Sequence, residues 1–450
     1  MKEDTLYARW QKLLSAERLG AGSGAYAPER TAFQQDYDRI VFTSAFRRLK
    51  DKTQVFPLSR SDYVRTRLTH SLEASCVGRS LGAVVGREII DRHRLPNVDA
   101  ADFGAIIAAA CLAHDIGNPP FGHAGEDAIR EWFKASGLLD KYDFSEAERA
   151  DLTQYEGNAQ GFRILTRLQN PDNPGLQLTS AVLATFTKYP RASSLETPLS
   201  GASGKKFGFF QDDAAAFARV AHATGLDARA PFAWHRHPLA FLVEVADDTC
   251  YLIVDLEDAA RLGFVRNEDA ETLLADLAGD SVTGGKLTRI SEPKERIEYL
   301  RAKAIGRLLE GAAAVFLENE ADIVAGRFDE GLLEASPAAT PLQAVKKIAR
   351  ENIYVARPAL EIETAGFEVL GGLLSLFIAA VESGAGQRPM TTREKMLLKL
   401  LPKQFLGAQG EPDANPYLRF LRIADFVTGM TDSYAVDLYR KLKGIDLPGE

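Results

Sequence analysis

Cysteine is scarce in this chain of 450 residues, which holds three: Cys76, Cys111 and Cys250. They are far apart and lie in apolar helical surroundings, so buried free thiols are favoured over a disulfide framework. Free thiols suit a reducing compartment. The first four residues, Met-Lys-Glu-Asp, do not begin an apolar signal segment. We therefore expect a cytoplasmic protein.

Long apolar runs are missing as well. The most apolar stretch, residues 366–381, contains Glu368 and is shorter than the roughly 20 residues that cross a bilayer. It predicts a buried helix, and we expect no membrane partner. The sequence also lacks strand-like alternation bounded by turn residues, and it has no repeat of fixed period. Apolar residues recur at helical spacing instead, which predicts an all-α fold.

The expected helices fall on both sides of the middle of the chain. They cover residues 66–92, 98–114, 122–132, 156–168, 178–188, 238–262, 292–325, 342–383, 391–406 and 416–442. Leu72, Val77, Leu81 and Val85 should form the buried side of the first of these. The Ser- and Gly-rich stretch 193–210 is the candidate for a mobile segment or one small β-hairpin.

We divide the chain into three regions. Residues 1–30 should form an N-terminal helix and a connector, and residues 31–265 should form the core that carries the functional site. Residues 266–450 should form a C-terminal helical region packed on that core.

The charge is acidic overall but uneven. A net charge of −8 argues against general electrostatic binding of nucleic acid. Between positions 46 and 70, however, seven Lys or Arg residues stand against two Asp residues. This basic segment could hold a compact anion such as a polyphosphate; a solvated basic loop is the alternative.

The stretch Cys-Leu-Ala-His-Asp-Ile-Gly-Asn-Pro-Pro-Phe-Gly-His, residues 111–123, organises the chain. An apolar helix runs directly into His114 and Asp115. Gly117 and the two prolines that follow prevent the helix from continuing. Imidazole and carboxylate groups on such rigid support are suited to binding a metal. The alternative is a surface histidine beside a helix-ending aspartate.

Four residues on predicted helices or at a helix end are candidate metal ligands. They are His70, His114, Asp115 and Asp247, and Asp248 is the runner-up for the last position. Two imidazoles and two carboxylates suit Mn²⁺, Fe²⁺, Ni²⁺, Co²⁺ or Zn²⁺, and also Mg²⁺ if substrate phosphate completes the shell. Such a set leaves positions open for water and a phosphoryl oxygen.

Two further sets of polar residues follow helical spacing. Asp247, Tyr251 and Asp255 lie four residues apart on one stripe of a helix, and their phenol and carboxylate groups fit recognition of a hydroxyl. The alternative is a buried tyrosine with a solvated aspartate. His123 and Glu126 lie three apart at a helix start, where they could transfer a proton. The alternative is a helix cap.

With these residues in place, the chain resembles the HD-domain deoxynucleoside triphosphate (dNTP) triphosphohydrolases, specifically the bacterial dGTPase group. The resemblance is carried by residues 46–56, 67–72, 114–123, 155–160, 246–258 and 429–435, and so extends over nearly the whole chain. Lys50 departs from the pattern, because glutamine is expected there. The chain is also shorter than the longest members, which weakens any transfer of DNA binding.

The resemblance implies a role for each of the matching residues. His70, His114, Asp115 and Asp247 would hold the metal, and His123 with Glu126 would be the catalytic pair. Gln54, Tyr251 and Asp255 would face the deoxyribose. Arg67 and Lys188 would contact phosphates.

The resemblance also implies a reaction and partners. The reaction is hydrolysis of a dNTP, dGTP foremost, to deoxynucleoside and inorganic triphosphate with a divalent cation, Mn²⁺ or Mg²⁺ foremost. A homo-oligomer, often a hexamer, and a dNTP or single-stranded DNA effector are expected. One alternative is an HD phosphodiesterase or nucleotidase, which would not need two basic polyphosphate contacts. The other is a non-catalytic nucleotide sensor, which would tolerate loss of His123 and Glu126.

Overall fold

The computed structural model describes residues 3–20, 30–54, 65–170, 175–282, 285–386, 388–407 and 409–445. The expected connector at residues 21–28 and positions 55–64 of the basic segment lie outside these ranges.

The described helices are α1 (Glu3–Leu13), α2 (Ala32–Val41), α3 (Ser44–Arg48), α4 (Arg67–His93), α5 (Ala100–Ala113), α6 (Gly122–Ala135), α7 (Glu146–Thr153), α8 (Gly157–Arg163), α9 (Ser180–Phe186), α10 (Ala214–Thr224), α11 (Pro238–Leu262), α12 (Asn267–Ala278), α13 (Pro293–Glu318), α14 (Glu320–Val324), α15 (Ala339–Ile348), α16 (Arg357–Gly384), α17 (Thr392–Leu400), α18 (Pro416–Thr428) and α19 (Asp432–Lys443).

The only sheet within the described ranges is a two-stranded antiparallel hairpin of β1 (Ala228–Ala230) and β2 (Ala233–Trp234). The predicted all-α fold with a small hairpin is therefore confirmed, but the hairpin is not where we expected it. Residues 193–210 form a loop with one short 3₁₀ turn at Ala202–Gly204. That stretch is rich in turn-forming residues but lacks the alternating pattern that pairs strands.

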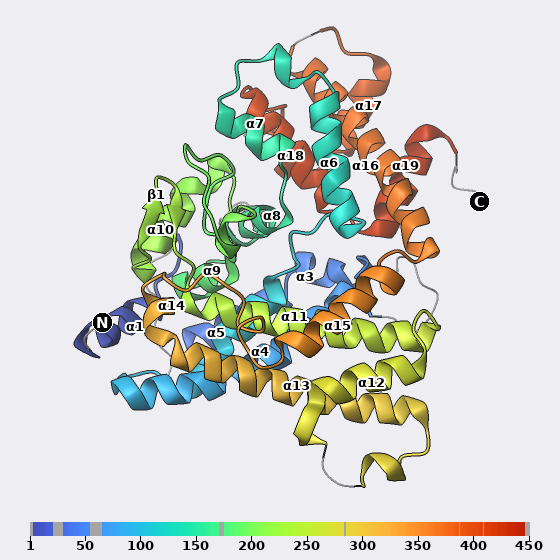
Figure 1. Cartoon of the computed structure of the whole chain (residues 1–450). Helices are drawn as coiled ribbons and strands as arrows, with labels where there is room; N and C mark the ends of the chain where they lie inside the picture. The colour runs from blue at the N-terminus through green and yellow to red at the C-terminus, as the bar shows by residue number, and fades with distance from the viewer. Residues whose placement is uncertain are drawn as a thin grey trace.

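Two clusters of buried apolar side chains hold the helices together. The larger cluster includes side chains from α4, α5, α11 and α13, and the smaller one includes side chains from α6, α16, α18 and α19. Figure 1 shows these as a lower and an upper group of helices. Although α6 comes early in the chain, it packs against α16 near the C-terminus. The three regions that we divided the chain into stay a proposal.

Helices α4 and α5 pack closely because glycine lines their contact. A Cβ on Gly82 would lie 2.9 Å from the carbonyl oxygen of Phe103. Leu81 and Val85 are buried as predicted and Val77 is partly buried, but Leu72 is exposed. At 100° per residue, Leu72 lies about half a turn from Leu81, so the two cannot share one face of the helix. The Cys76 thiol is also exposed, contrary to our prediction of a buried one.

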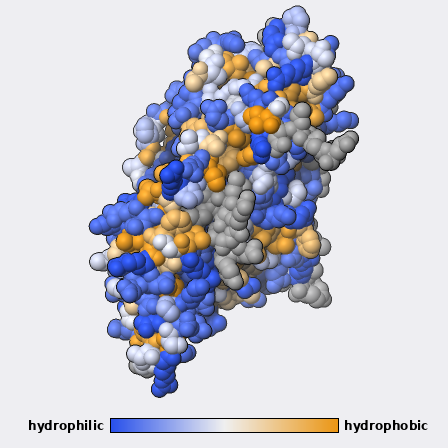
Figure 2. Space-filling view, turned by 90° about the vertical axis from the view of Figure 1, so that its right-hand side faces the viewer, coloured by the Kyte–Doolittle hydropathy of each residue, from blue (hydrophilic) through white to orange (hydrophobic). Residues whose placement is uncertain are grey.

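Helix α16 is the one described helix that is long and apolar enough to cross a membrane. Half of its most apolar window is buried inside the protein, where it contacts α6, α17 and α18. The face drawn in Figure 2 is largely hydrophilic, with apolar residues in scattered groups. These observations fit the predicted buried helix.

Candidate active site

The end of α5 provides rigid support for His114 and Asp115. Asp99 and Asp102 cap the start of this helix reciprocally, and its second half is fully buried. Beyond its end, Gly117 lies against α8. A Cβ at this position would come within 2.1 Å of the carbonyl oxygen of Gly157, so a larger residue would force the two segments apart. The local backbone is therefore fixed by packing on both sides of the two polar residues.

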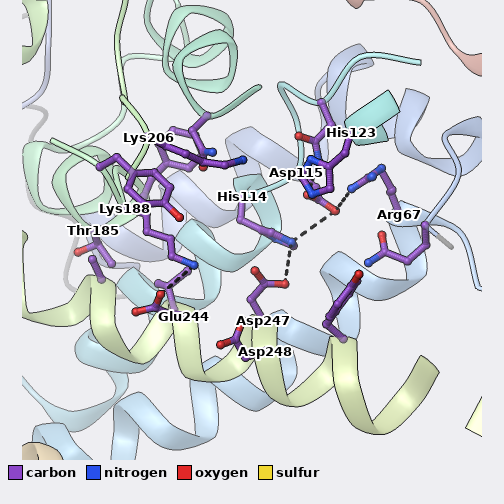
Figure 3. A pocket seen from close by; sticks show the side chains of 18 residues that line it. Arg67, His114, Asp115, His123, Thr185, Lys188, Lys206, Glu244, Asp247 and Asp248 are labelled. Carbon is purple, nitrogen blue, oxygen red and sulfur yellow. Dashed lines mark hydrogen bonds and ion pairs between the residues drawn. The ribbon is translucent and has the colours of Figure 1, made fainter. Parts of the chain in front are cut away.

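The structure brings the four candidate ligands together from three elements. His70 comes from α4, His114 and Asp115 from the end of α5, and Asp247 from α11. Ligand atoms of the first three lie within 4.8 Å of one another. Asp247 Oδ1 lies 3.1 Å from His70 Nε2 and 3.4 Å from His114 Nε2. Figure 3 shows His114 directly above Asp247 in the cavity.

The chemistry of this cluster fits a cation. His114 donates a hydrogen bond from Nδ1 to the carbonyl oxygen of Cys111 at 2.6 Å, which points Nε2 toward the carboxylates. That Nε2 is buried and makes no hydrogen bond within the described part of the chain, although Asp115 and Asp247 lie 3.5 and 3.4 Å from it. Burial lowers the pKa of His114, but Asp115 and Asp247 outweigh it and raise the pKa to about 9. An unpartnered imidazole nitrogen facing two carboxylates is a suitable donor set for a divalent ion.

Both carboxylates in the cluster stay ionised. Burial opposes ionisation of Asp115, but Arg67 and His114 hold its pKa at about 2. Burial likewise opposes ionisation of Asp247, and the imidazoles of His114 and His70 hold its pKa well below the usual range. In contrast, burial raises the pKa of Asp248 to about 7, against the attraction of Lys188. It is thus Asp247, and not the runner-up Asp248, that lies beside both histidines.

A cavity of about 360 Å³ opens on this cluster. It brings together Gln54, Arg67, His114, Asp115, His123, Lys188, Asp247 and Tyr251 from the predicted set, with Asn118, Asn158, Tyr189, Lys206, Glu244 and Asp248 among its other lining residues. Lys188 and Lys206 lie on one side of His114, and Asp115, His123 and Arg67 on the other (Figure 3). The walls therefore combine a carboxylate and imidazole cluster with three cationic side chains.

His123 and Glu126 form the expected pair at the start of α6. His123 Nδ1 donates to Glu126 Oε2 at 2.9 Å, and the His123 side chain is 76% exposed. Glu126 is buried and also accepts a hydrogen bond from the Gly157 amide at 2.7 Å. Burial opposes its ionisation, but His123 and Lys206 lower the pKa of Glu126 to about 2. A charged Glu126 therefore holds the imidazole through Nδ1, and Nε2 is the ring nitrogen that does not contact Glu126.

Each predicted phosphate-binding cation is already paired with a carboxylate. Arg67 Nη1 donates to Asp115 Oδ2 at 2.6 Å, while its buried Nε has no partner in the described part of the chain. Lys188 Nζ lies 2.9 Å from Glu244, which also accepts from Arg236. These pairings hold both cations at the cavity wall. Gln54 lines the same cavity, and its buried side-chain oxygen has no partner among the residues that the structure describes.

The predicted sugar-binding residues meet a residue that we did not predict. Tyr251 stacks on Tyr354, with ring centroids 5.5 Å apart and 18° between the ring planes. The Tyr354 hydroxyl donates to Asp255 at 3.4 Å. Asp255 is buried, and among the described residues it does not line the cavity directly. Asp255 is thus linked to the cavity through Tyr354, which stacks on the lining residue Tyr251.

Two residues near the predicted set were missed, for different reasons: Tyr354, which stacks on the lining residue Tyr251, and Lys206, which lines the cavity itself. Tyr354 lies far along the chain, and no local pattern relates it to Tyr251. Lys206 belongs to the stretch that we interpreted as mobile, where the pair Lys205-Lys206 was the available signal. Its ammonium lies 3.0 Å from Glu156 and 4.0 Å from Glu126.

Comparisons with known proteins show which family the chain is similar to. The HD domain model matches residues 67–175, and the phosphohydrolase-associated domain model matches residues 335–441. A protein of Synechocystis sp. named deoxyguanosinetriphosphate triphosphohydrolase-like protein is 48% identical, over 97% of this chain and all of that protein. A protein of the same name from Pseudomonas aeruginosa is 42% identical, over 98% and 99% of the two chains. A deoxyguanosinetriphosphate triphosphohydrolase of Yersinia enterocolitica is 32% identical, over 91% and 93%.

Proposed function

Since the chain belongs to the deoxyguanosinetriphosphate triphosphohydrolase-like family of HD-domain phosphohydrolases, we propose that it hydrolyses a dNTP, dGTP foremost, to deoxynucleoside and inorganic triphosphate. This membership confirms the resemblance found in the sequence. The observation that carries the proposal is the cavity itself. One wall holds the imidazole and carboxylate cluster, and the cationic side chains flank it. Binding of a polyphosphate next to a metal ion requires both the metal ligands and the cationic side chains.

His70, His114, Asp115 and Asp247 would hold the divalent ion, with Mn²⁺ or Mg²⁺ foremost and Fe²⁺, Ni²⁺, Co²⁺ or Zn²⁺ also compatible with the donor set. When bound, the ion supplies positive charge beside the reacting phosphate and makes a water more acidic. Asp115 and Asp247 are ionised at neutral pH, as metal ligands must be.

The cavity's cations would hold the triphosphate. Arg67 presents a planar guanidinium suited to two parallel contacts with phosphate oxygens. Lys188 and Lys206 lie across the cavity as compact charges. All three are fixed by carboxylates, so little side-chain freedom remains to be lost when a substrate binds. This favours a polyphosphate over the cyclic or monophosphate substrates of the alternative HD hydrolases.

His123 would move the proton that the reaction requires. The leaving group is the 5′ oxygen of the nucleoside, which departs badly as an alkoxide at neutral pH. Glu126 holds the Nδ1 proton of His123, so Nε2 at the cavity is the nitrogen that exchanges a proton. An intact pair of this kind argues against a non-catalytic nucleotide sensor.

The partners and location stay proposals too. We expect a homo-oligomer, a hexamer by family resemblance, with a dNTP or single-stranded DNA as effector, in the cytoplasm. Mass measurement of the native protein, with and without dNTPs, tests the oligomer.

Product analysis tests the reaction. We expect each active dNTP to give equal amounts of deoxynucleoside and inorganic triphosphate in the presence of Mn²⁺ or Mg²⁺, and neither product in EDTA. Chromatography of the nucleoside together with phosphorus NMR of the released phosphate checks this. Release of deoxynucleoside monophosphate with pyrophosphate, or of single phosphates, would contradict the proposal.

A substrate analogue that lacks the 3′ hydroxyl tests the proposed sugar contacts of Gln54, Tyr251 and Asp255. We expect dideoxy-GTP, which lacks the 3′ hydroxyl, to lose about 1–3 kcal/mol of transition-state binding because buried polar groups stay unpaired. This corresponds to roughly a 5- to 150-fold lower kcat/KM than for dGTP. GTP should also be turned over weakly.

A matched pair of tyrosine variants locates this effect. Tyr251→Phe should shrink the preference for dGTP over dideoxy-GTP, while Tyr189→Phe, another cavity tyrosine, should leave it unchanged. If dideoxy-GTP or GTP is hydrolysed as well as dGTP, the sugar assignment of Gln54, Tyr251 and Asp255 is wrong.

A further inference from the structure

A buried carboxylate joins the C-terminal region to the loop that precedes His123. Asp432, the first residue of α19, is 1% exposed. Its Oδ1 accepts a hydrogen bond from the Phe121 amide at 3.1 Å. Its Oδ2 accepts from the Thr53 amide at 3.0 Å and from the Thr53 hydroxyl.

A buried lysine, Lys52, also links the C-terminal region to the loop before α6, because it donates hydrogen bonds to both. The Lys52 ammonium donates to the carbonyl oxygens of Asn118 and Thr428, at 2.5 and 2.9 Å. The carbonyl oxygen of Lys52 in turn accepts from the Arg67 amide at 3.2 Å. The turn between α18 and α19 is therefore tied to three cavity segments, which carry Gln54, Arg67 and the 114–123 stretch.

Phe121 is the point at which this connection can affect chemistry. It caps the start of α6 in the left-handed conformation, with φ of 63°, which a bulky residue adopts only when its surroundings impose it. Asp432 holds its amide. Its ring lies against α16, where a Cβ on Gly366 would come within 2.9 Å of ring atoms. The C-terminal region thus binds the Phe121 backbone through Asp432 and contacts the Phe121 ring through α16.

The position of His123 depends on where α6 begins. Its side chain is 76% exposed, and its ring is hydrogen-bonded to Glu126 on the same helix. The place of the ring relative to Asp115 is therefore set by the packing of α6 and by the loop that leads from Asp115 into it. Phe121 is the last residue of that loop, and its amide is bound by Asp432.

We propose that Asp432 is a positioning residue for proton transfer. By holding Phe121 in the left-handed conformation, it places His123 next to the candidate metal ligands. The proposal rests on the proposed function and deepens it. It gives the phosphohydrolase-associated region, residues 335–441, a physical role in the chemistry of the HD domain region, residues 67–175.

Kinetics of Asp432→Asn tests the proposal. This change keeps the size of the side chain but leaves an amide donor facing an amide or hydroxyl donor. We expect kcat for dGTP to fall roughly 10- to 100-fold, as small misplacements of catalytic groups do. KM and metal content should stay near wild type. Gly366→Ala, which pushes on the Phe121 ring, should lower kcat in the same way and provides a second variant if Asp432→Asn does not fold.

The control is Asp425→Asn. Asp425 is as buried as Asp432, but it accepts from Gln160 and Arg163 instead of from the loop before α6. Its substitution should lower the melting temperature and leave kcat within about twofold of wild type. In a His123→Ala background, Asp432→Asn should cost less than about threefold more, because the two residues act on one step. A wild-type kcat in Asp432→Asn, or an equal loss in both backgrounds, overturns the proposal.

Hydrogen exchange separates this proposal from the proposed function, because it needs no activity. The amides of residues 121–124 should exchange at least about tenfold faster in Asp432→Asn than in wild type or Asp425→Asn. Unchanged exchange overturns the positioning role. If the wild-type protein hydrolyses no dNTP while exchange increases as expected, the proposed function fails and the contact through Phe121 stands.

Discussion

His114→Ala should remove the bound divalent ion and reduce dNTP hydrolysis to background, while the helical fold persists. The substitution deletes the buried, unpartnered Nε2 that faces Asp115 and Asp247. It also removes the donor to the Cys111 carbonyl oxygen, a loss of about 1 kcal/mol of stability that a domain of this size tolerates. Asp115→Ala should have the same effect on the metal. Elemental analysis of the purified variant and circular dichroism check the two halves of this expectation.

His93→Ala is the matched control for His114→Ala. His93 also has a buried side chain beside a carboxylate, with Nε2 2.6 Å from Glu320, but it lies at the far end of α4. We expect it to lose stability and keep its metal. Full metal occupancy in His114→Ala and Asp115→Ala would show that the ligands were wrongly assigned.

The metal should also compete with a proton at His114. Burial lowers the pKa of this imidazole, but the carboxylates raise it to about 9 in the metal-free cluster. Below that pH the ion must displace a proton, so metal affinity should fall as the pH is lowered from 9 to 7. Asp115, with a pKa of about 2, stays ionised over this range and contributes nothing to the change. Calorimetric titration in two buffers of different ionisation enthalpy should show proton release at pH 8.

His123→Ala should lower kcat by about 10²–10⁴-fold, the usual contribution of a general acid or base, and leave metal content nearly unchanged. The ring lies at the cavity on α6 and makes its hydrogen bond to Glu126, not to the metal cluster. Glu126→Ala should cost less, because Glu126 orients the imidazole. The double variant should lose much less than the two free-energy costs added together.

Single-turnover release of triphosphate, with metal assayed in parallel, measures these effects. The pH–rate profile of the wild type should have a limb that is missing in His123→Ala. A wild-type rate in His123→Ala would show that His123 has no part in proton transfer and is only a residue at the start of α6. Loss of metal in that variant would place it among the ligands instead.

The sequence by itself indicated most of the helices and the residue types of the candidate site, although the helix expected over 416–442 is divided into α18 and α19. Helical periodicity is local, so the bounds of α4, α5 and α11 follow closely from it. The break after Asp115 is also local, because Gly117 and the prolines act on the adjoining backbone. The donor chemistry of the four candidate ligands can be read from residue types, although their roles as ligands stay predictions.

Only the tertiary structure decided what surrounds those residues. The glycines of α4 show how closely α5 approaches it, and that approach depends on where the two helices meet. Tyr354 stacks on Tyr251 from a distant helical turn, and Asp432 reaches Phe121 across most of the chain. Each of these depends on which distant segments meet, and that is fixed by burial of the two apolar clusters as a whole. A local pattern carries no information about such partners, so the stack on Tyr251 and the contact of Asp432 with Phe121 could not be predicted.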